Sequence, residues 1–409
     1  MSSHPILLLR PPKISPRSSP KGKVNKGPFY PPDAQWTKHG PILKSLRDSL
    51  GNESITISKS NYGIDPEYAL VVETIEPVQN LLNATKKIKD LELLRESDIE
   101  AFDSDEITST GEATAEDEPK KIRNHRLFFM MTNHAAIDQL INLFEKWKSN
   151  PTMEFDIGLT PFRDLFGYVE TIRRWSIEER VRETGILEDW KARNESNDKD
   201  LPFEAELWYR SDRNKRQNAE ANVVRQITGL GGKIIKASVI NDINYHFIVG
   251  QIPARAISEL KELEELSLFR CEDVCYFRPT AQISAKYGDN TEPFEIDLEA
   301  EKSPVGDPII ALLDGLPVEK HRFLDGRLIV DDPDNYSSGY EAAKRRHGTN
   351  MASLICHGDL AAYTRSISRP IYVRPIMKPD SNSYHWNVEK VPETESVVDL
   401  VHRAVRRIF

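Results

Sequence analysis

The residues of this chain that could do chemistry as a pair are Asp314 and His347. Asp314 ends the apolar run at 309–313, which is typical of a buried strand, and Gly315 follows it. In α/β folds, functional groups are often placed at the end of a central strand. His347 begins a His-Gly-Thr sequence that apolar residues at helical spacing follow. These two residues predict a carboxylate that orients an imidazole, which then transfers a proton.

The pair resembles the first two catalytic blocks of the subtilisin-like serine peptidases (subtilases), in which the order along the chain is Asp, His and then Ser. The resemblance covers about residues 307–409. It differs in one respect, because Gly315 follows the acid directly where many subtilases have Ser or Thr before the Gly. The resemblance implies a serine endopeptidase that acts on a protein or peptide substrate by acyl transfer. In that reaction Asp314 orients His347, and His347 moves the proton of a serine hydroxyl.

The catalytic serine of the family has no counterpart among the residues that follow His347. In the family, the serine lies in a Gly-Thr-Ser block and an Asn before it forms the oxyanion hole, and neither follows His347. The serines after His347 are not in a Gly-x-Ser context; they are Ser353, Ser366, Ser368, Ser381, Ser383 and Ser396. We therefore expect an N-terminal portion of a longer subtilase that is inactive alone. It would be a fragment, a truncated reading frame or one piece of a split enzyme, with the C-terminal part of the catalytic domain as a partner.

Upstream of this region, the apolar pattern predicts two α/β modules. Residues 199–280 predict the complete order β-α-β-β-α-β, which is the ferredoxin-like unit (α/β plait). Residues 61–198 predict β-α-β-β-α, one strand short of that unit, with a helical extension over 159–191. The predicted fold class is α/β: a truncated subtilase-type parallel α/β sheet preceded by two ferredoxin-like, propeptide-like modules.

The position of the second module adds to the resemblance. A ferredoxin-like unit directly before a subtilase catalytic domain is similar to the subtilase propeptide, a folding chaperone and inhibitor whose C-terminal segment lies in the substrate cleft. We expect the acidic residues 281–306 to be a linker and the region of processing or cleft occupancy. Residues 1–60 begin with a basic segment rich in Pro and Ser, and they are predicted to be a flexible arm.

The overall composition disfavours several classes of protein. The net charge of −9 argues against a nucleic-acid partner, and no segment has the ~20 apolar residues of a membrane span. The apolar run at 6–9 is shorter than the ~7–15 residues of a secretory signal. The cysteines are too few for a disulfide framework, so we interpret them as buried apolar side chains in a cytoplasmic protein; they are Cys271, Cys275 and Cys356.

No cofactor is predicted, but one metal alternative stays open. Asp331, Asp332 and Asp334 are either ligands of a structural Ca²⁺, since carboxylate oxygens suit that ion, or part of a solvated turn. Large bacterial subtilases that resemble this layout are often encoded beside an AAA-type ATPase, which makes such an ATPase a candidate partner. The alternative function is a non-catalytic binding or inhibitor protein built from the propeptide-like modules.

Overall fold

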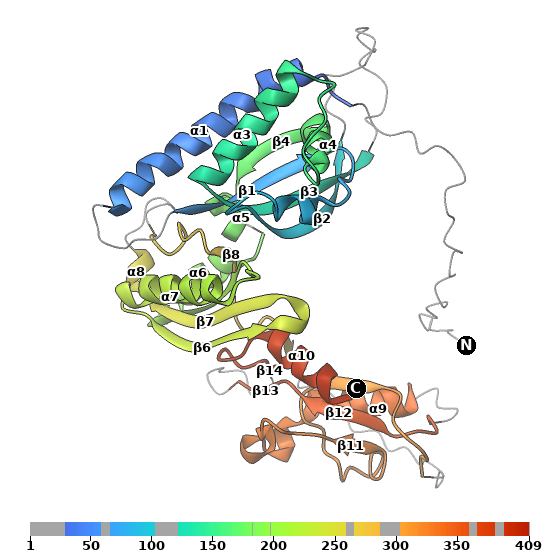
Figure 1. Cartoon of the computed structure of the whole chain (residues 1–409). Coiled ribbons are helices and arrows are strands. Elements are labelled where there is room, and N and C mark those ends of the chain that lie inside the picture. Colours follow the sequence, from blue (N-terminus) through green and yellow to red (C-terminus); the bar gives the residue numbers. More distant parts are fainter. Residues whose placement is uncertain are drawn as a thin grey trace, which may run out of the picture. The chain divides into compact units, whose positions relative to one another are not determined.

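The computed structural model describes residues 29–58, 66–102, 122–181, 183–196, 198–258, 266–286, 303–359, 366–380 and 388–408 (Figure 1). The chain forms two compact units, residues 1–175 and 176–409. The fold is mixed α/β, with antiparallel and parallel sheets. The division falls before the module boundary expected at residue 198. The reason is that Val181, Ile186 and Trp190 are buried in a core of the second unit.

The first unit contains a four-stranded antiparallel sheet with the order β2-β3-β1-β4. Its strands are β1 (Glu67–Thr74), β2 (Glu92–Phe102), β3 (Ile122–Asn133) and β4 (Val169–Arg174). Its helices are α1 (Pro32–Ser58), α2 (Leu81–Thr85), α3 (His134–Ser149) and α4 (Thr160–Tyr168). Alternate residues of β1 and β3, such as Leu70 and Met130, share one core with the stacked rings of Phe144 and Phe166.

The predicted helical extension over 159–191 is wrong in type at one place. The range is helical at 160–168, 177–181 and 186–195, but α4 ends at Tyr168 and the strand β4 follows it directly. Val169 and Ile172 fit a helical spacing, yet they are buried from a strand, because the sheet supplies hydrogen-bond partners that the local pattern does not reveal. This unit therefore has the fourth strand that the sequence pattern lacked.

The flexible arm predicted over residues 1–60 is wrong from Pro32 onward, where the 27-residue helix α1 begins. Leu43 and Leu50 are buried in the core of the first unit, and Trp36 packs against it. These residues recur on one face of a helix, whereas the composition of the preceding segment dominates the prediction. Residues 1–28 and 103–121 lie outside the described residues.

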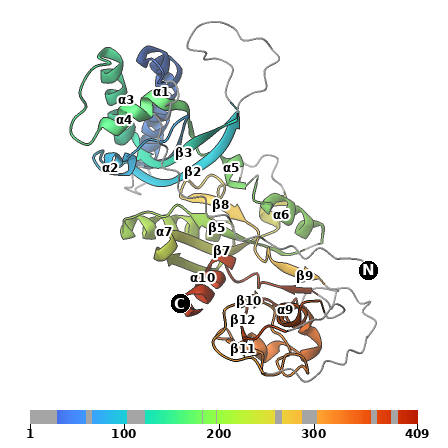
Figure 2. The same ribbon diagram turned by 90° about the vertical axis from the view of Figure 1, so that its right-hand side faces the viewer.

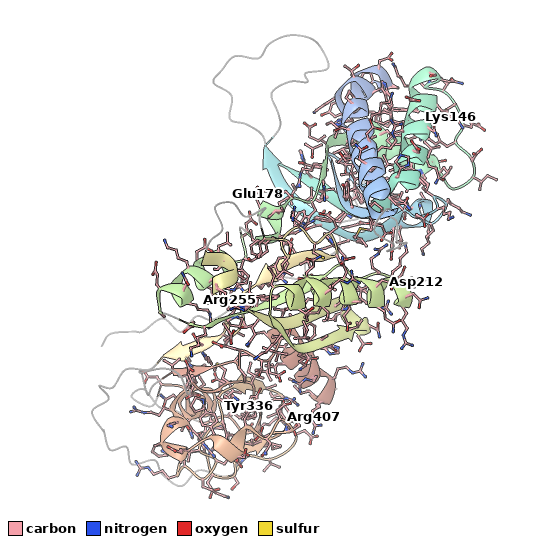
Figure 3. The ribbon with its side chains drawn as sticks, turned by 90° about the vertical axis from the view of Figure 1, so that its left-hand side faces the viewer. Lys146, Glu178, Asp212, Arg255, Tyr336 and Arg407 are labelled. Atoms are coloured by element: carbon pink, nitrogen blue, oxygen red, sulfur yellow. The ribbon has the colours of Figure 1, made fainter. Side chains whose placement is uncertain are left out.

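The second unit contains another four-stranded antiparallel sheet, with the order β6-β7-β5-β8. Its strands are β5 (Asp200–Leu207), β6 (Lys233–Ile240), β7 (Tyr245–Pro253) and β8 (Val274–Arg278). Its helices are α5 (Ile177–Val181), α6 (Ile186–Glu195), α7 (Arg213–Gly229) and α8 (Arg255–Ser258). Asp212, labelled in Figure 3, caps α7 by accepting hydrogen bonds from the backbone N–H groups of Asn214 and Lys215, at 2.6 and 3.2 Å.

The C-terminal part of this unit is built on a three-stranded parallel sheet with the order β10-β12-β11. The strands are β10 (Ala311–Asp314), β11 (Leu328–Val330) and β12 (Ile371–Pro375). Helix α9 (Arg346–His357) lies beside β10 (Figure 2) and packs on the sheet through Ala352 and Cys356. Helix α10 (Val397–Ile408) follows later in the chain. The buried strand predicted over 309–313 begins two residues late, and Ile309 is 75% exposed.

A small antiparallel sheet has the order β13-β14-β9. Its strands are β9 (Ser284–Lys286), β13 (Lys378–Pro379) and β14 (Val388–Lys390). Strand β9 belongs to the segment 281–306 that was expected to be a linker, and its Ala285 lies opposite Glu389 in the register. Residues 287–302 of that segment lie outside the described residues. The described residues also form the short 3₁₀ turns η1 (Asn241–Ile243), η3 (Tyr336–Gly339) and η4 (Ala342–Lys344).

Candidate functional site

Asp314 is held at the carboxyl end of β10. Its backbone carbonyl accepts a hydrogen bond from the N–H of Ile376 at 2.8 Å, just past the end of the neighbouring strand β12. Its side chain is only 8% exposed, and Oδ1 accepts the N–H of Gly315 at 2.5 Å. A carboxylate in such a low-polarity position needs partners that donate to it. The strand therefore presents a buried carboxylate acceptor, and the imidazole of His347 is its partner.

His347 is the second residue of α9, and its ring meets this carboxylate. Nδ1 of His347 lies 2.6 Å from Oδ1 of Asp314. Because a carboxylate accepts, Nδ1 is the nitrogen that carries the proton, and Nε2 keeps a free lone pair. The His347 side chain is 28% exposed, and no described residue hydrogen-bonds to its Nε2. The arrangement can accept a proton at Nε2 and stabilise the resulting imidazolium through Asp314.

The remaining residues of the His-Gly-Thr sequence have clear physical roles. A Cβ atom on Gly348 would lie 2.1 Å from the carbonyl oxygen of Gly315, so only glycine allows α9 to approach the end of β10 this closely. Thr349 accepts a hydrogen bond at Oγ1 from the backbone N–H of Val318, at 2.9 Å. The sequence therefore joins the start of α9 to the loop after Asp314 at two points beside the imidazole.

Glu389 and Tyr340 belong to the site, although no local pattern in the sequence marks them. Glu389, on β14, accepts the backbone N–H of His347 at Oε1, at 3.0 Å, and the hydroxyl of Tyr340 at Oε2. Its side chain has no solvent exposure. Burial raises the pKa of the Glu389 carboxyl above its usual value, while the hydrogen bonds from Tyr340 and from the His347 backbone oppose that shift. The site thus holds two buried carboxyl groups, Asp314 and Glu389.

The candidate calcium ligands bind other groups of the protein. Asp331 pairs with Arg407, labelled in Figure 3, at 2.6 Å, and with the hydroxyl of Tyr372. Asp334 accepts from Arg374, and Asp332 accepts the backbone N–H groups that begin the turn η3. Within the described residues, no group of three or more His, Cys, Asp or Glu side chains is placed to hold a metal ion.

The other residues that chemistry could use have structural positions. His357 is the last residue of α9. Its Nδ1 lies 2.6 Å from Oγ of Ser366, and its Nε2 lies 2.7 Å from the carbonyl oxygen of Phe323. That histidine–serine pair is buried. Ser396 is buried at the start of α10. Ser381 and Ser383 lie outside the described residues. The three cysteines are buried and unpaired by disulfides, as predicted.

None of the described helices is long and apolar enough to cross a membrane. The comparisons with known proteins give no relative of this chain. No family model matches it, no curated protein matches it, and no solved structure matches it. The assignment of function therefore depends on the residues and geometry of this chain alone.

Proposed function

We propose that this chain carries the acid and base of a serine endopeptidase of the subtilisin-like type. The observation that supports the proposal best is the 2.6 Å contact between Asp314 and Nδ1 of His347. The acid ends a parallel strand, the histidine is in the first turn of a helix, and the imidazole is 28% exposed with no described residue hydrogen-bonded to its second nitrogen. This combination of an oriented tautomer and an accessible base is what nucleophile activation requires.

In the proposed mechanism, a serine outside the described residues attacks the carbonyl carbon of a peptide. Nε2 of His347 takes the proton of the serine hydroxyl and later gives it to the departing amine. Asp314 stays ionised, holds the ring through Nδ1 and stabilises the imidazolium while the proton is on Nε2. Water then attacks the acyl-enzyme: Nε2 of His347 takes a proton from the water and gives it to the departing serine oxygen, which releases the carboxylic acid product.

We propose further that both four-stranded sheets are ferredoxin-like modules and that the second is a propeptide. Their shared strand order supports the first idea. Contacts with the first turn of α10 and with the segment just before it support the second: Nζ of Lys236, on β6, lies 2.7 Å from carboxylate oxygens of both Glu395 and Asp399. Such partly buried, charge-assisted contacts are specific in geometry, which suits a module that docks in one orientation.

The test is peptide hydrolysis, together with labelling by a serine-directed fluorophosphonate, by the protein expressed from its complete reading frame. His347→Ala and Asp314→Asn should each lower kcat on the order of 10⁴-fold or more, since the triad acts as a unit. His134→Ala is the matched control, because His134 is an exposed histidine on α3, far along the chain from the site. Undiminished turnover in the His347→Ala protein would rule the proposal out.

The second candidate function is binding or inhibition of a protease without catalysis. It is favoured by the fact that, among the described residues, no serine hydroxyl is hydrogen-bonded to Nε2 of His347. In that case Asp314 and His347 are a structural pair, and the second sheet caps a partner enzyme. Titration of the whole chain into a subtilisin-type protease separates the two: tight inhibition, with no turnover or labelling from the complete reading frame, supports this function over the first.

A further inference from the structure

Glu389 is a fully buried acid that the proposed reaction does not use. It lies between Val388 and Lys390 on the short strand β14 and has 0% exposure. Both of its carboxylate oxygens are engaged: Oε1 accepts the backbone N–H of His347 at 3.0 Å, and Oε2 accepts the hydroxyl of Tyr340. The carboxylate is therefore directed at the start of the helix that carries the candidate base.

The contact with the backbone of His347 has a clear physical purpose. His347 is in the first turn of α9, where backbone N–H groups have no acceptor within the helix. The Glu389 carboxylate supplies that acceptor, and a negative charge is favourable at the N-terminus of a helix. Fixing this N–H fixes the point from which the imidazole extends, while Asp314 fixes Nδ1 of the ring. Two carboxylates therefore hold one histidine, at its backbone and at its ring.

Glu389 also gives a physical reason for Gly315. A Cβ atom built on Gly315 would lie 1.8 Å from Oε2 of Glu389 and 2.7 Å from the hydroxyl oxygen of Tyr340. The space into which a side chain at position 315 would project is thus filled by the carboxylate and its partner. The Gly that directly follows Asp314, where many subtilases have Ser or Thr, fits this packing.

A charged group at this position has an energetic cost. Burial raises the pKa of Glu389, which means that its ionised form is disfavoured relative to an exposed glutamate. If the role were only to accept one N–H, a neutral glutamine would do the same without burying a charge. A carboxylate gains an advantage over an amide when a positive charge forms nearby, as it does when His347 takes a proton.

We propose that Glu389 is a positioning residue of the proposed peptidase site. Its carboxylate holds the backbone of His347 so that Nδ1 stays on Asp314 and Nε2 is presented to the reactant, and its charge stabilises the imidazolium. The kinetic part of this inference rests on the proposed function. The geometric part does not, because the contact between Asp314 and His347 exists without the nucleophile.

The kinetic experiment compares Glu389→Gln with Glu341→Gln in the protein from the complete reading frame. Glu341 is the matched control, since its side chain is 74% exposed in the same segment that leads into α9. Glu389→Gln should lower kcat by roughly 10- to 100-fold, as loss of an orienting partner does elsewhere. KM and the melting temperature should stay close to those of the wild type, because glutamine fills the same volume. A wild-type kcat in the Glu389→Gln protein would overturn the electrostatic role.

The geometric experiment follows the Nδ1–H proton of His347 by NMR in the chain labelled with ¹⁵N-histidine. The wild type should show a slowly exchanging, downfield resonance that Asp314→Asn removes. Glu389→Ala should broaden or abolish it, and Tyr340→Phe should weaken it by removing one of the two contacts of the carboxylate. If Glu389→Ala does not fold, faster exchange of this proton in the Tyr340→Phe protein carries the same test, and unchanged exchange in that protein overturns the inference.

The two experiments fail in different ways. A resonance that is intact in the Glu389→Ala protein overturns the positioning role, even if the protein is a peptidase. A resonance that depends on Glu389 in a protein without turnover or fluorophosphonate labelling leaves the positioning role standing and removes the proposed function.

Discussion

Each of the two units contains a short contact between a histidine and a carboxylate. In the second unit, Nδ1 of His347 lies 2.6 Å from Asp314; in the first, Nδ1 of His125 lies 2.7 Å from Oε1 of Glu73. The histidine side chains differ in exposure, which is 28% for His347 and 4% for His125. Nε2 of His125 is buried with no hydrogen-bond partner. The two pairs therefore have similar contact lengths and differ in the exposure of the histidine.

The elements that hold the two pairs differ as well. His125, Glu73 and Thr171 come from three neighbouring strands of one antiparallel sheet, and Thr171 donates to Oε2 of Glu73 at 3.0 Å. Such cross-strand pairs contribute to the stability of a sheet. His347, in contrast, meets Asp314 where a helix begins and a strand ends. The first pair therefore lies within a sheet, whereas the second lies where two elements end and is the more exposed of the two.

The largest expected difference between the pairs is in their reaction with diethyl pyrocarbonate, which acylates accessible neutral imidazoles. His347 should react from the native state. His125 should react only through local opening of the sheet, which slows its modification on the order of a hundredfold or more. Peptide mapping of the modified chain at pH 7 measures both rates. Similar rates would break the comparison.

The packing around the second pair should make Gly315→Ala strongly destabilising. The new Cβ would lie 1.8 Å from Oε2 of Glu389, in a region without free volume. Overpacking of this kind costs about 3 kcal/mol and should also displace His347. Urea unfolding measures the loss. Gly339→Ala is the control, because a Cβ at Gly339 has no atom within 4 Å, and a comparable loss there would contradict the explanation.

Removal of His125 should lower the stability of the protein more than removal of His347, which is the reverse of their expected order of reaction with diethyl pyrocarbonate. His125→Ala should lower the free energy of unfolding by about 2 kcal/mol, since it leaves a cavity and removes a donor from the partly buried Glu73. His347→Ala should cost less than about 1 kcal/mol, because solvent replaces part of its ring. Chemical denaturation of the two variants gives both values. A larger loss for His347→Ala would show that the second pair is mainly structural.

A third histidine, His39, is buried, and neither of its ring nitrogens has a hydrogen-bond partner in the described part of the chain. Burial, helped by the nearby charge of Lys38, lowers the pKa of His39 to about 4. Because the unfolded chain takes up this proton at higher pH than the folded one, stability is full above pH ~6.5 and falls as pH drops toward 4. Solvent screens the charge of Lys38, whose side chain is half-exposed, so we expect the free energy of unfolding to fall by only about 1 kcal/mol. His39→Leu should flatten this part of the stability–pH curve; an unchanged curve would assign the loss to other groups.

The sequence predicts the parts of the site that local chemistry marks. Asp314 and His347 are recognisable because each has a short pattern around it, and the structure brings them into contact. Glu389 is not recognisable, since its partner His347 is 42 positions away and its strand has only three residues. Nothing in the local pattern distinguishes a buried glutamate from the exposed acids around it. Contacts between distant segments decide which acid is part of the site.

The fold is predicted where one periodicity dominates. Strand β6 belongs to the predicted β-α-β-β-α-β order, and its bounds follow from turn signals on both sides, the glycines before Lys233 and the Asn-Asp pair after Ile240. Strand β4 is missed because Val169 and Ile172 fit both a helix and a bulged strand, and only pairing with β1 decides between them. Helix α1 is missed because its apolar face is sparse and the segment before it is rich in Pro, Ser and Lys. Tertiary partners settle what local pattern leaves ambiguous.

The close approach of Gly315 and Glu389 also has an evolutionary consequence. The two positions share one volume, so a side chain at 315 is tolerated only after the residue at 389 has become shorter. The order of substitutions matters, and the same change would be harmful in one background and neutral in the other. Homologous chains should therefore fall into two groups, with either Gly and Glu or a larger residue and a smaller one, and few intermediates between them.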